Sequence, residues 1–296
     1  MTATLETTTP DAVDLRSGDR GVTTADFAST VLAPPTGRAG MVDTATTFAG
    51  RTLRQFRRTP QLIVVGALTS TMFLLIFRYV FGGAIATGDV AYVDFLIPGL
   101  AAAGAMFSGT GGAVGVAEDV ESGMFDRLRS LPIPRSAVLI GRSMADTALV
   151  GWGLFITVAV GVLTGFRFHG SALDAVVAVA LCLLYGVAFT WPFIYMGLVG
   201  GSAQAAQGLS MLAFPFVFVS SAYVPVESMP GWLQPVAEHQ PITPMVGSVR
   251  ALTLGDQAEA VLGHSAGWFA VRAVAWSIVI VAIFLPLATR RFARAS

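Results

Sequence analysis

Long apolar runs are the feature of this sequence that most limits its fold. Six of them reach about the 20 residues that an α-helix needs to cross a hydrocarbon core about 30 Å thick. Hydrophobic residues make up 54% of the chain and charged residues only 12%, so a water-soluble fold could not cover its own apolar surface. The sequence predicts an all-α membrane protein with six transmembrane helices, at about 61–81, 92–116, 137–164, 173–199, 206–224 and 268–288.

The arginines predict the orientation, because the cytoplasmic loops of membrane proteins are enriched in basic residues. If both termini are cytoplasmic, only Arg78, Arg167, Arg250 and Arg272 of the 18 basic residues fall outside. We therefore expect a multi-pass protein of the plasma membrane with its N and C termini in the cytoplasm. Residues 1–41, rich in Thr, Ala and Pro, are expected to form a disordered cytoplasmic tail before a membrane domain at 42–291.

The sequence contains no lysine, and this absence excludes one kind of active site. A Walker A loop needs a lysine to reach the terminal phosphates of ATP, so an ordinary P-loop ATPase site cannot form here. Any ATP hydrolysis that drives this protein must come from another chain. The single cysteine, Cys182, lies in an apolar run and is expected to be a small buried hydrophobe.

The segment 42–58 has the pattern of an amphipathic helix at the membrane interface. At a helical step of 100°, an apolar stripe of Val42, Ala45, Ala49, Leu53 and Phe56 forms on one side. Arginines on the opposite side would face anionic headgroups. Because the stripe is rich in alanine, the end of a soluble helix remains the alternative. The arginines of this segment are Arg51, Arg54 and Arg58.

The cytoplasmic stretch EDVESGMFDRLRSLPIPRSAVLIGR, 118–142, mixes acids and arginines with apolar residues at short-helix spacing. A short helix here would leave the apolar side chains of Phe125 and Leu128 exposed to water unless another surface packs against them. The cover could be the interfacial helix of the protein itself or lipid headgroups. It could instead be the groove of a soluble partner, into which the helix would fit.

The outer stretch VPVESMPGWLQPVAEHQPITPMVGSVRAL, 224–252, is too apolar for a free loop and too rich in proline for one spanning helix. Two short helices that dip into the outer leaflet would fit this pattern. An ordered surface loop is the alternative. The residues expected to shape this re-entrant segment include Pro225, Pro230, Trp232 and Pro241.

Few polar residues fall inside the apolar runs. Arg142 and Asp146 are four apart, so we expect them to pair on one helix and to reach toward the headgroups. The three histidines are spread over the outer loops, so no metal site is expected. An ion-gradient-driven carrier would need ionisable residues near the membrane midplane, and a membrane-embedded enzyme would need a paired catalytic group. Neither pattern stands out.

Three blocks in this order and at this separation resemble the ABC type 2 permease family, in particular its daunorubicin-resistance-type drug exporters. The blocks are YVDFLIPGLAAAG (92–104), the stretch 118–142, and FPFVFVSSAYVPVESMPGWLQPVAEHQPITPMVGSVRAL (214–252). The resemblance covers about 42–291. It implies an elbow helix before the first span, six transmembrane helices, a coupling helix in the first cytoplasmic loop and extracellular re-entrant helices.

The resemblance also implies partners. Two ABC ATPase subunits would bind ATP and Mg²⁺, a second permease subunit, identical or related, would face this one, and membrane lipid would surround both. The chain itself would need no cofactor, would not be an enzyme and would not bind nucleic acid. The residues that match the family's coupling motif, and that are expected to dock the ATPase, are Glu121, Gly123, Met124, Phe125, Leu128 and Arg135.

The substrate path of the family runs between the second and fifth spans of the two subunits. This sequence offers a soft, aromatic surface there, which suits amphipathic drugs or lipids. For any one of these residues, helix packing or lipid contact is the alternative. The expected function is the permease subunit of an ATP-driven exporter, with an ion-gradient-driven carrier as the alternative. The expected path residues are Met106, Phe107, Thr110, Met211, Phe214, Phe216 and Phe218.

Overall fold

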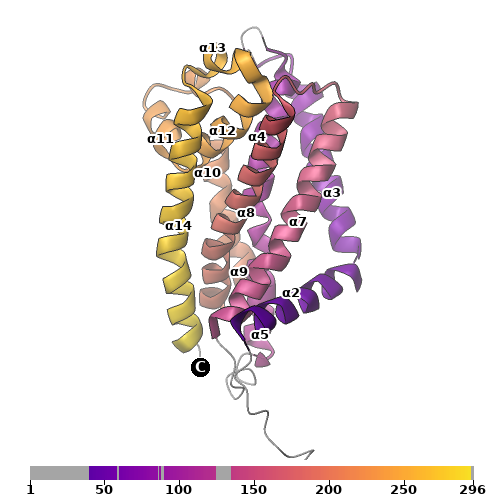
Figure 1. The fold of residues 1–296 in the computed structure, drawn as a ribbon, viewed down its shortest axis with the longest axis vertical. Coiled ribbons are helices and arrows are strands. Elements are labelled where there is room, and N and C mark those ends of the chain that lie inside the picture. The colour runs from indigo at the N-terminus through magenta and orange to yellow at the C-terminus, as the bar shows by residue number, and fades with distance from the viewer. Residues whose placement is uncertain (1–39, 59, 86, 88–89, 125–134, 295–296) are drawn as a thin grey trace, which may run out of the picture. The chain divides into compact units, whose positions relative to one another are not determined.

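The computed structural model describes residues 40–58, 60–85, 87, 90–124 and 135–294. Every regular element in these ranges is a helix, so the all-α expectation is confirmed. Among the described residues, five helical stretches are long and apolar enough to cross a membrane, and they run alongside one another in Figure 1. They are Val64–Phe81, Tyr92–Glu121, Ala137–Leu163, Ala172–Gly200 and Ala266–Ala293.

These five stretches lie close to five of the six expected spans. Two of the stretches combine two elements each. In the first, α3 (Pro60–Leu75) passes into the π-helical turn η1 (Ile76–Phe81). In the second, α4 (Tyr92–Phe107) is separated from α5 (Gly109–Glu121) only by Ser108. Proline at the first position of α3 suits a helix start, since its missing N–H would be unpaired there anyway. The elements are α3 (Pro60–Leu75), η1 (Ile76–Phe81), α4 (Tyr92–Phe107), α5 (Gly109–Glu121), α7 (Arg135–Leu163), α8 (Ala172–Gly200) and α14 (Ala266–Arg294).

The expected fifth span differs from the others, because it is short and broken. It consists of α9 (Ala203–Ser210), the 3₁₀ turn η2 (Met211–Ala213) and α10 (Phe214–Phe218). Pro215 lies in the first turn of α10 and cannot donate a hydrogen bond to the preceding helix. At 1.5 Å per residue, Ala203–Phe218 is about 24 Å long, which is less than a hydrocarbon core of about 30 Å.

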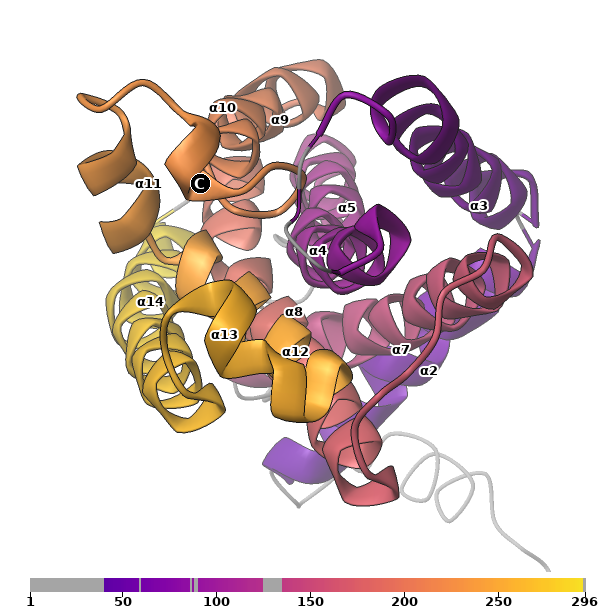
Figure 2. The same ribbon diagram turned by 90° about the horizontal axis from the view of Figure 1, so that it is seen from above.

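Helix α8 lies at the centre of the packing. The hydroxyl groups of Tyr185 on α8 and Ser248 are 2.5 Å apart and form a buried hydrogen bond. Figure 2 shows α4 and α8 in the interior and α3 and α14 at the periphery. The helices that contact α8 are α4, α5, α7, α9, α14 and α12 (Ile242–Leu254).

Helix α2 (Met41–Arg58) packs along α7, near the end of the bundle where α14 also ends (Figure 1). Ala45 and Ala49 are buried, as the expected stripe requires, but Val42 is 73% exposed and Leu53 is 38% exposed. The buried face is rotated because α7 covers only one side of α2. Val42 and Leu53 therefore stay available to another apolar surface.

Short helices gather at the opposite end of the bundle (Figure 1). Proline stands directly before two of them, Pro225 before η3 and Pro241 before α12, where it breaks no helical hydrogen bond. Helix α12 packs against α4, α8 and α14, so this end is more than a surface loop. The other short elements here are η3 (Val226–Ser228), α11 (Gln234–His239), η4 (Gly255–Gln257) and α13 (Ala258–Leu262).

Candidate functional site

Aromatic rings from distant parts of the chain form a continuous row. Phe107, at the end of α4, contacts Phe214 of α10 with ring centroids 4.6 Å apart. Phe214 stacks on Phe218 at 6.3 Å, as expected for residues four apart on a helix. Phe218 contacts Tyr223, in the segment after α10, at 5.2 Å. The row therefore runs from the α4–α5 junction toward η3.

Tyr223 extends this row to the first crossing. Its ring stacks on Phe77 of η1 at 4.6 Å, and the hydroxyl of Tyr92 donates to the backbone carbonyl of Tyr223 at 3.1 Å. Aromatic pairs of this kind contribute about 0.5–1.5 kcal/mol each beyond the area that they bury. We call the connected rings the aromatic ladder; its members are Phe107, Phe214, Phe218, Tyr223 and Phe77.

Three of the residues expected to line the substrate path belong to the aromatic ladder: Phe107, Phe214 and Phe218. The other four lie elsewhere. Met106 is 3% exposed and packs in the main core, and Thr110 is half-buried on α5. Met211 and Phe216 are 50% and 61% exposed. The assignment of all seven to a transport path stays a prediction.

Sequence reasoning missed two members of the ladder. Phe77 carried a readable signal, since Phe73, Phe77 and Phe81 recur at four-residue spacing and their neighbouring rings lie 6.3 and 5.3 Å apart. Tyr223 carried none. Its place is set by tertiary contacts with Phe77 and Phe218, and no local spacing encodes them.

The expected coupling loop is described only at its two ends. Glu121, the last residue of α5, is exposed, and Met124 is half-buried. Gly123 has φ of 67°, a left-handed conformation that glycine adopts without strain and that ends the helix. Arg135 is the first residue of α7. Phe125 and Leu128 lie outside the described residues, so the docking role stays a prediction.

An ion pair links α2 to α5 just before this loop. Nη2 of Arg51 lies 3.2 Å from Oδ1 of Asp119, and the two side chains are 47% and 21% exposed. An exposed pair of this kind contributes at most about 1 kcal/mol to stability, so its main effect is to orient α2 relative to α5. Of the other expected interfacial residues, Arg54 and Arg58 are exposed, and Phe56 lies within α2.

The expected pair inside the third crossing is confirmed. Nε of Arg142 lies 3.3 Å from Oδ1 of Asp146, four residues along α7. The arginine does not reach toward the headgroups, however, because its Nη2 donates to the backbone carbonyl of Gly111 on α5 at 2.7 Å. Asp146 is fully buried, and its Oδ2 has no hydrogen-bond partner within the described part of the chain. Through this hydrogen bond, Arg142 connects α7 to the first turn of α5.

Arg250, expected on the outer side of the membrane, is buried on α12, where it forms a joint between α12, α4 and the segment after α10. It is 1% exposed, its Nε donates to the carbonyl of Phe95 at 2.9 Å, and its Nη2 donates to the carbonyls of Ser221 and Ala222 at 2.8 and 3.2 Å. Its guanidinium also lies 3.5 Å above the Phe95 ring. Burial lowers the pKa of this guanidinium to about 9, so the group is still a cation at neutral pH.

The joint depends on a close approach of two backbones. A Cβ added at Gly99 of α4 would collide with the carbonyl oxygen of Ala222. Glycine at this position therefore lets the segment after α10 lie directly against α4. Arg250 then binds the carbonyls on both sides of that contact.

The residues expected to shape the outer segment lie just before and between the short helices η3, α11 and α12. Pro225 is half-buried, and the carbonyl of Pro230 accepts a hydrogen bond from the N–H of Leu233 at 2.8 Å. Trp232 is 77% exposed, which places a large aromatic ring on the surface. Pro241 precedes α12. Short helices do form here, while their depth in the outer leaflet stays a prediction.

No group of three potential metal ligands occurs within the described ranges. Nδ1 of His239 lies 2.9 Å from the carbonyl of Pro235, and His264 stacks on Trp268. Cys182 is 1% exposed, as expected for a small core residue.

Known proteins with similar sequences agree on the type of protein. Residues 45–254 match the model of the ABC-2 type transporter family. The chain is 31% identical, over 86% of its length and 88% of the relative, to the daunorubicin resistance ABC transporter permease protein DrrB1 of Streptomyces coeruleorubidus. It is 25% identical, over 75% of its length and 83% of the relative, to the probable doxorubicin resistance ABC transporter permease protein DrrC of Mycobacterium tuberculosis H37Rv.

A more distant relative is the putative transport permease ycf38 of Cyanophora paradoxa, 24% identical over 67% of this chain and 70% of the relative. The family match and the apolar helices together identify a multi-pass membrane protein. Since the family model covers well over half of the sequence, the chain belongs to the ABC-2 type transporter family.

Proposed function

We propose that this chain is the permease subunit of an ATP-driven exporter that moves amphipathic drugs or lipids from the cytoplasm or the inner leaflet to the outside. A separate ATPase subunit, present in two copies, supplies the energy, and a second permease completes the path. The named activities of the two drug-resistance relatives support this proposal. So does the absence of lysine, because the chain cannot hold an ordinary P-loop.

The aromatic ladder is the observation that carries the proposal. It brings together Phe107 and Phe214, which come from the second and fifth expected spans. Phe218 is exposed and Phe107 and Phe214 are half-buried, so these three rings offer an apolar surface against which a planar amphipathic substrate can pack. Phe216 and Met211, exposed on the same segment, are placed to meet the second permease or lipid.

The coupling step starts at the loop between α5 and α7. When ATP closes the two ATPase subunits, each loop is carried inward, and the helices that hold it rotate together. Contacts that differ between the two ATPase states shift the equilibrium between the inward-open and outward-open forms. The Arg51–Asp119 pair supports joint movement of α2 and α5. The Arg142–Gly111 hydrogen bond supports joint movement of α5 and α7.

The six crossings of this proposal include the short segment Ala203–Phe218. The end with α2 and the coupling loop faces the cytoplasm, together with both termini. The end with α11, α12 and α13 faces outside, and its short helices are the re-entrant ones. A membrane-impermeant thiol reagent tests this orientation: Gln257→Cys is labelled from outside and Thr46→Cys is not, since both residues are exposed and Cys182 is buried.

Reconstitution tests the function. The full-length permease, coexpressed with the ATPase encoded beside it, should copurify with that ATPase and should export a fluorescent amphipath from vesicles only when ATP is present. Phe214→Ala should reduce export strongly, while Phe155→Ala, an exposed ring on α7 outside the ladder and the expected path, serves as the matched control. Export that needs no ATP, or equal loss in both variants, contradicts the proposal.

One observation favours a second candidate, an ion-gradient-driven carrier. Asp146 is fully buried, and one of its carboxylate oxygens is unpartnered among the described residues, which is the kind of group that such carriers use. In the exporter, Asp146→Asn should leave transport dependent on ATP and insensitive to a proton gradient. Gradient-driven transport without ATP that Asp146→Asn abolishes would instead support the carrier.

A further inference from the structure

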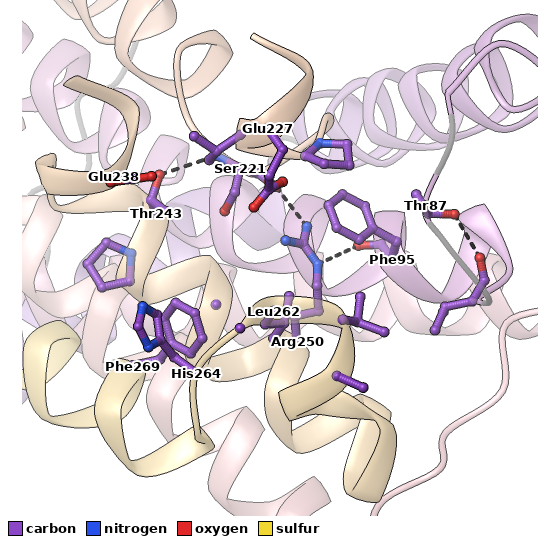
Figure 3. A pocket seen from close by; sticks show the side chains of 18 of the residues that line it. Thr87, Phe95, Ser221, Glu227, Glu238, Thr243, Arg250, Leu262, His264 and Phe269 are labelled. Atoms are coloured by element: carbon purple, nitrogen blue, oxygen red, sulfur yellow. Dashed lines mark hydrogen bonds between the residues drawn. The ribbon is translucent and has the colours of Figure 1, made fainter. Parts of the chain in front are cut away.

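A cavity of about 1080 Å³ lies among the short helices at the end of the bundle that holds α12 and α13 (Figure 3). Its size matches that of small-molecule sites, which are about 300–1,000 Å³. The walls come from segments far apart in the sequence: the loop before α4, α4, the segment after α10 with η3, α11, α12, η4, α13 and the start of α14. This cavity is separate from the aromatic ladder, and none of the ladder's rings lines it.

The two guanidinium groups in the wall are already engaged. Arg250 binds three backbone carbonyls and covers the ring of Phe95, as Figure 3 shows in part. The guanidinium carbon of Arg272 lies 4.2 Å from the centroid of Trp268. Arg250 is therefore poorly placed to bind an anionic ligand, whereas the cation–π contact of Arg272 leaves its positive charge in the wall.

The carboxylates in the wall are in the opposite situation. Glu227, Glu238 and Asp256 all line the cavity and all are exposed. Within the described part of the chain, none of the three forms an ion pair. They outnumber the two arginines, so the accessible charge of the cavity is negative. Glu227 is close enough to the buried Arg250 to interact with its charge, so Glu238 and Asp256 are the carboxylates most available to an organic cation.

Aromatic and aliphatic side chains complete the wall. Phe95 and Phe269 line it, and the His264 ring stacks on Trp268 with centroids 3.9 Å apart. Val261 and Leu262 of α13 add aliphatic surface. Arg250 and Arg272 already cover the faces of Phe95 and Trp268, so this part of the wall mainly offers apolar contact to the uncharged part of a ligand.

We propose that this cavity is a binding site for amphipathic organic cations. The inference rests on the proposed exporter function, in which the cavity takes up cationic substrates on their way out. Ser221 and Pro225 line it, and Tyr223 between them carries the end of the aromatic ladder. The segment 221–225 therefore borders both the ladder and the cavity, so a substrate that leaves the ladder at Tyr223 is next to the cavity.

Direct binding tests the site without any transport. The probe is ethidium, a planar aromatic cation, added to the full-length permease in lipid nanodiscs without ATP. The combined variant Glu227→Gln, Glu238→Gln and Asp256→Asn should bind ethidium about tenfold more weakly. Glu259→Gln is the matched control, since Glu259 is exposed on α13 but does not line the cavity. Anilinonaphthalene sulfonate, an aromatic anion, should not bind more weakly to the combined variant.

Chemical protection locates the bound probe. Gln257 lines the cavity, and Cys182 is buried, so the thiol introduced by Gln257→Cys reacts alone with a membrane-impermeant maleimide. Saturating ethidium should abolish labelling of Gln257→Cys and leave labelling of Glu259→Cys unchanged. The proposal is overturned if ethidium does not bind saturably, if the combined variant binds it as well as wild type, or if neither thiol is protected.

The two proposals fail in different ways. A permease that never copurifies with an ATPase and shows no ATP-dependent export refutes the exporter function, whatever the ethidium titration gives. A permease that exports with ATP but binds ethidium equally with and without the three carboxylates refutes only the cation site.

Discussion

The ring of Phe77 stacks on the ring of Tyr223 at 4.6 Å with an interplanar angle of 15°. This contact joins the first crossing to the segment that follows α10, and it is the point where the aromatic ladder meets the wall of the outer cavity. Any movement of α3 and η1 relative to α10 must therefore separate or slide these two rings.

Tyr223→Leu should break this contact and interrupt the ladder. We expect the free energy of unfolding to fall by about 1–3 kcal/mol, because the ring contacts with both Phe77 and Phe218 are lost. Export should be almost abolished. Export from vesicles and unfolding of the purified protein in detergent measure the two effects. Tyr223→Phe keeps the ring and should behave like wild type; a defect equal to that of Tyr223→Leu would mean that the hydroxyl, not the stack, matters.

Arg250→Met should be the most destabilising of these single changes. It leaves the carbonyls of Phe95, Ser221 and Ala222 buried without their donor, at a cost of at least about 3 kcal/mol. Thermal unfolding followed by tryptophan fluorescence measures the loss. Arg272→Met is the control, since it removes only a cation–π contact and should cost about 0.5–1 kcal/mol. Equal melting temperatures for the two variants would refute the role of Arg250 as a joint.

Gly99→Ala should push the segment after α10 away from α4. Its added Cβ meets the carbonyl oxygen of Ala222, which is backbone and cannot move aside as a flexible side chain could. We expect a lower melting temperature and faster proteolysis near Ala222. Gly104→Ala, on the same helix with no atom near the new Cβ, should have no such effect. A harmless Gly99→Ala would contradict the close approach.

The Arg51–Asp119 pair should affect coupling more than stability. Arg51→Ala and Asp119→Ala each remove an exposed pair worth at most about 1 kcal/mol, so unfolding should change little. Substrate-stimulated ATP hydrolysis by the complex should fall in both. The double variant should be no worse than either single one, since both remove the same contact. Arg54→Ala, exposed on the same helix, is the control, and additive losses would argue against the link.

The positions of the long helices could be predicted because they depend on local composition. Each apolar run must satisfy its own backbone hydrogen bonds in lipid, so its length largely fixes the helix. The span predicted at 137–164 corresponds to α7, Arg135–Leu163, and the span predicted at 173–199 corresponds to α8, Ala172–Gly200. The Arg142–Asp146 pair could also be predicted from the sequence, since its spacing is that of one helical turn.

Features that depend on a distant partner could not be predicted. The buried face of α2 is set by α7, and for that reason Val42 and Leu53 stay exposed. From its neighbours in the sequence, Arg250 looks like an arginine in a loop. It is buried because residues distant in the sequence, Phe95 and the segment 221–222, pack around it and accept its hydrogen bonds. The cavity depends on segments from Thr87 to Arg272 meeting, and no spacing within any one of them encodes this.

The shortness of Ala203–Phe218 has a consequence for the surrounding bilayer. In the proposed six-span topology, this stretch of about 24 Å beside a hydrocarbon layer of about 30 Å creates hydrophobic mismatch, which lipids relieve by local thinning. The thinned lipid would lie next to Phe214 and Phe218. Acyl chain length should then set how far a substrate must travel along these rings, so thicker bilayers should slow this transporter.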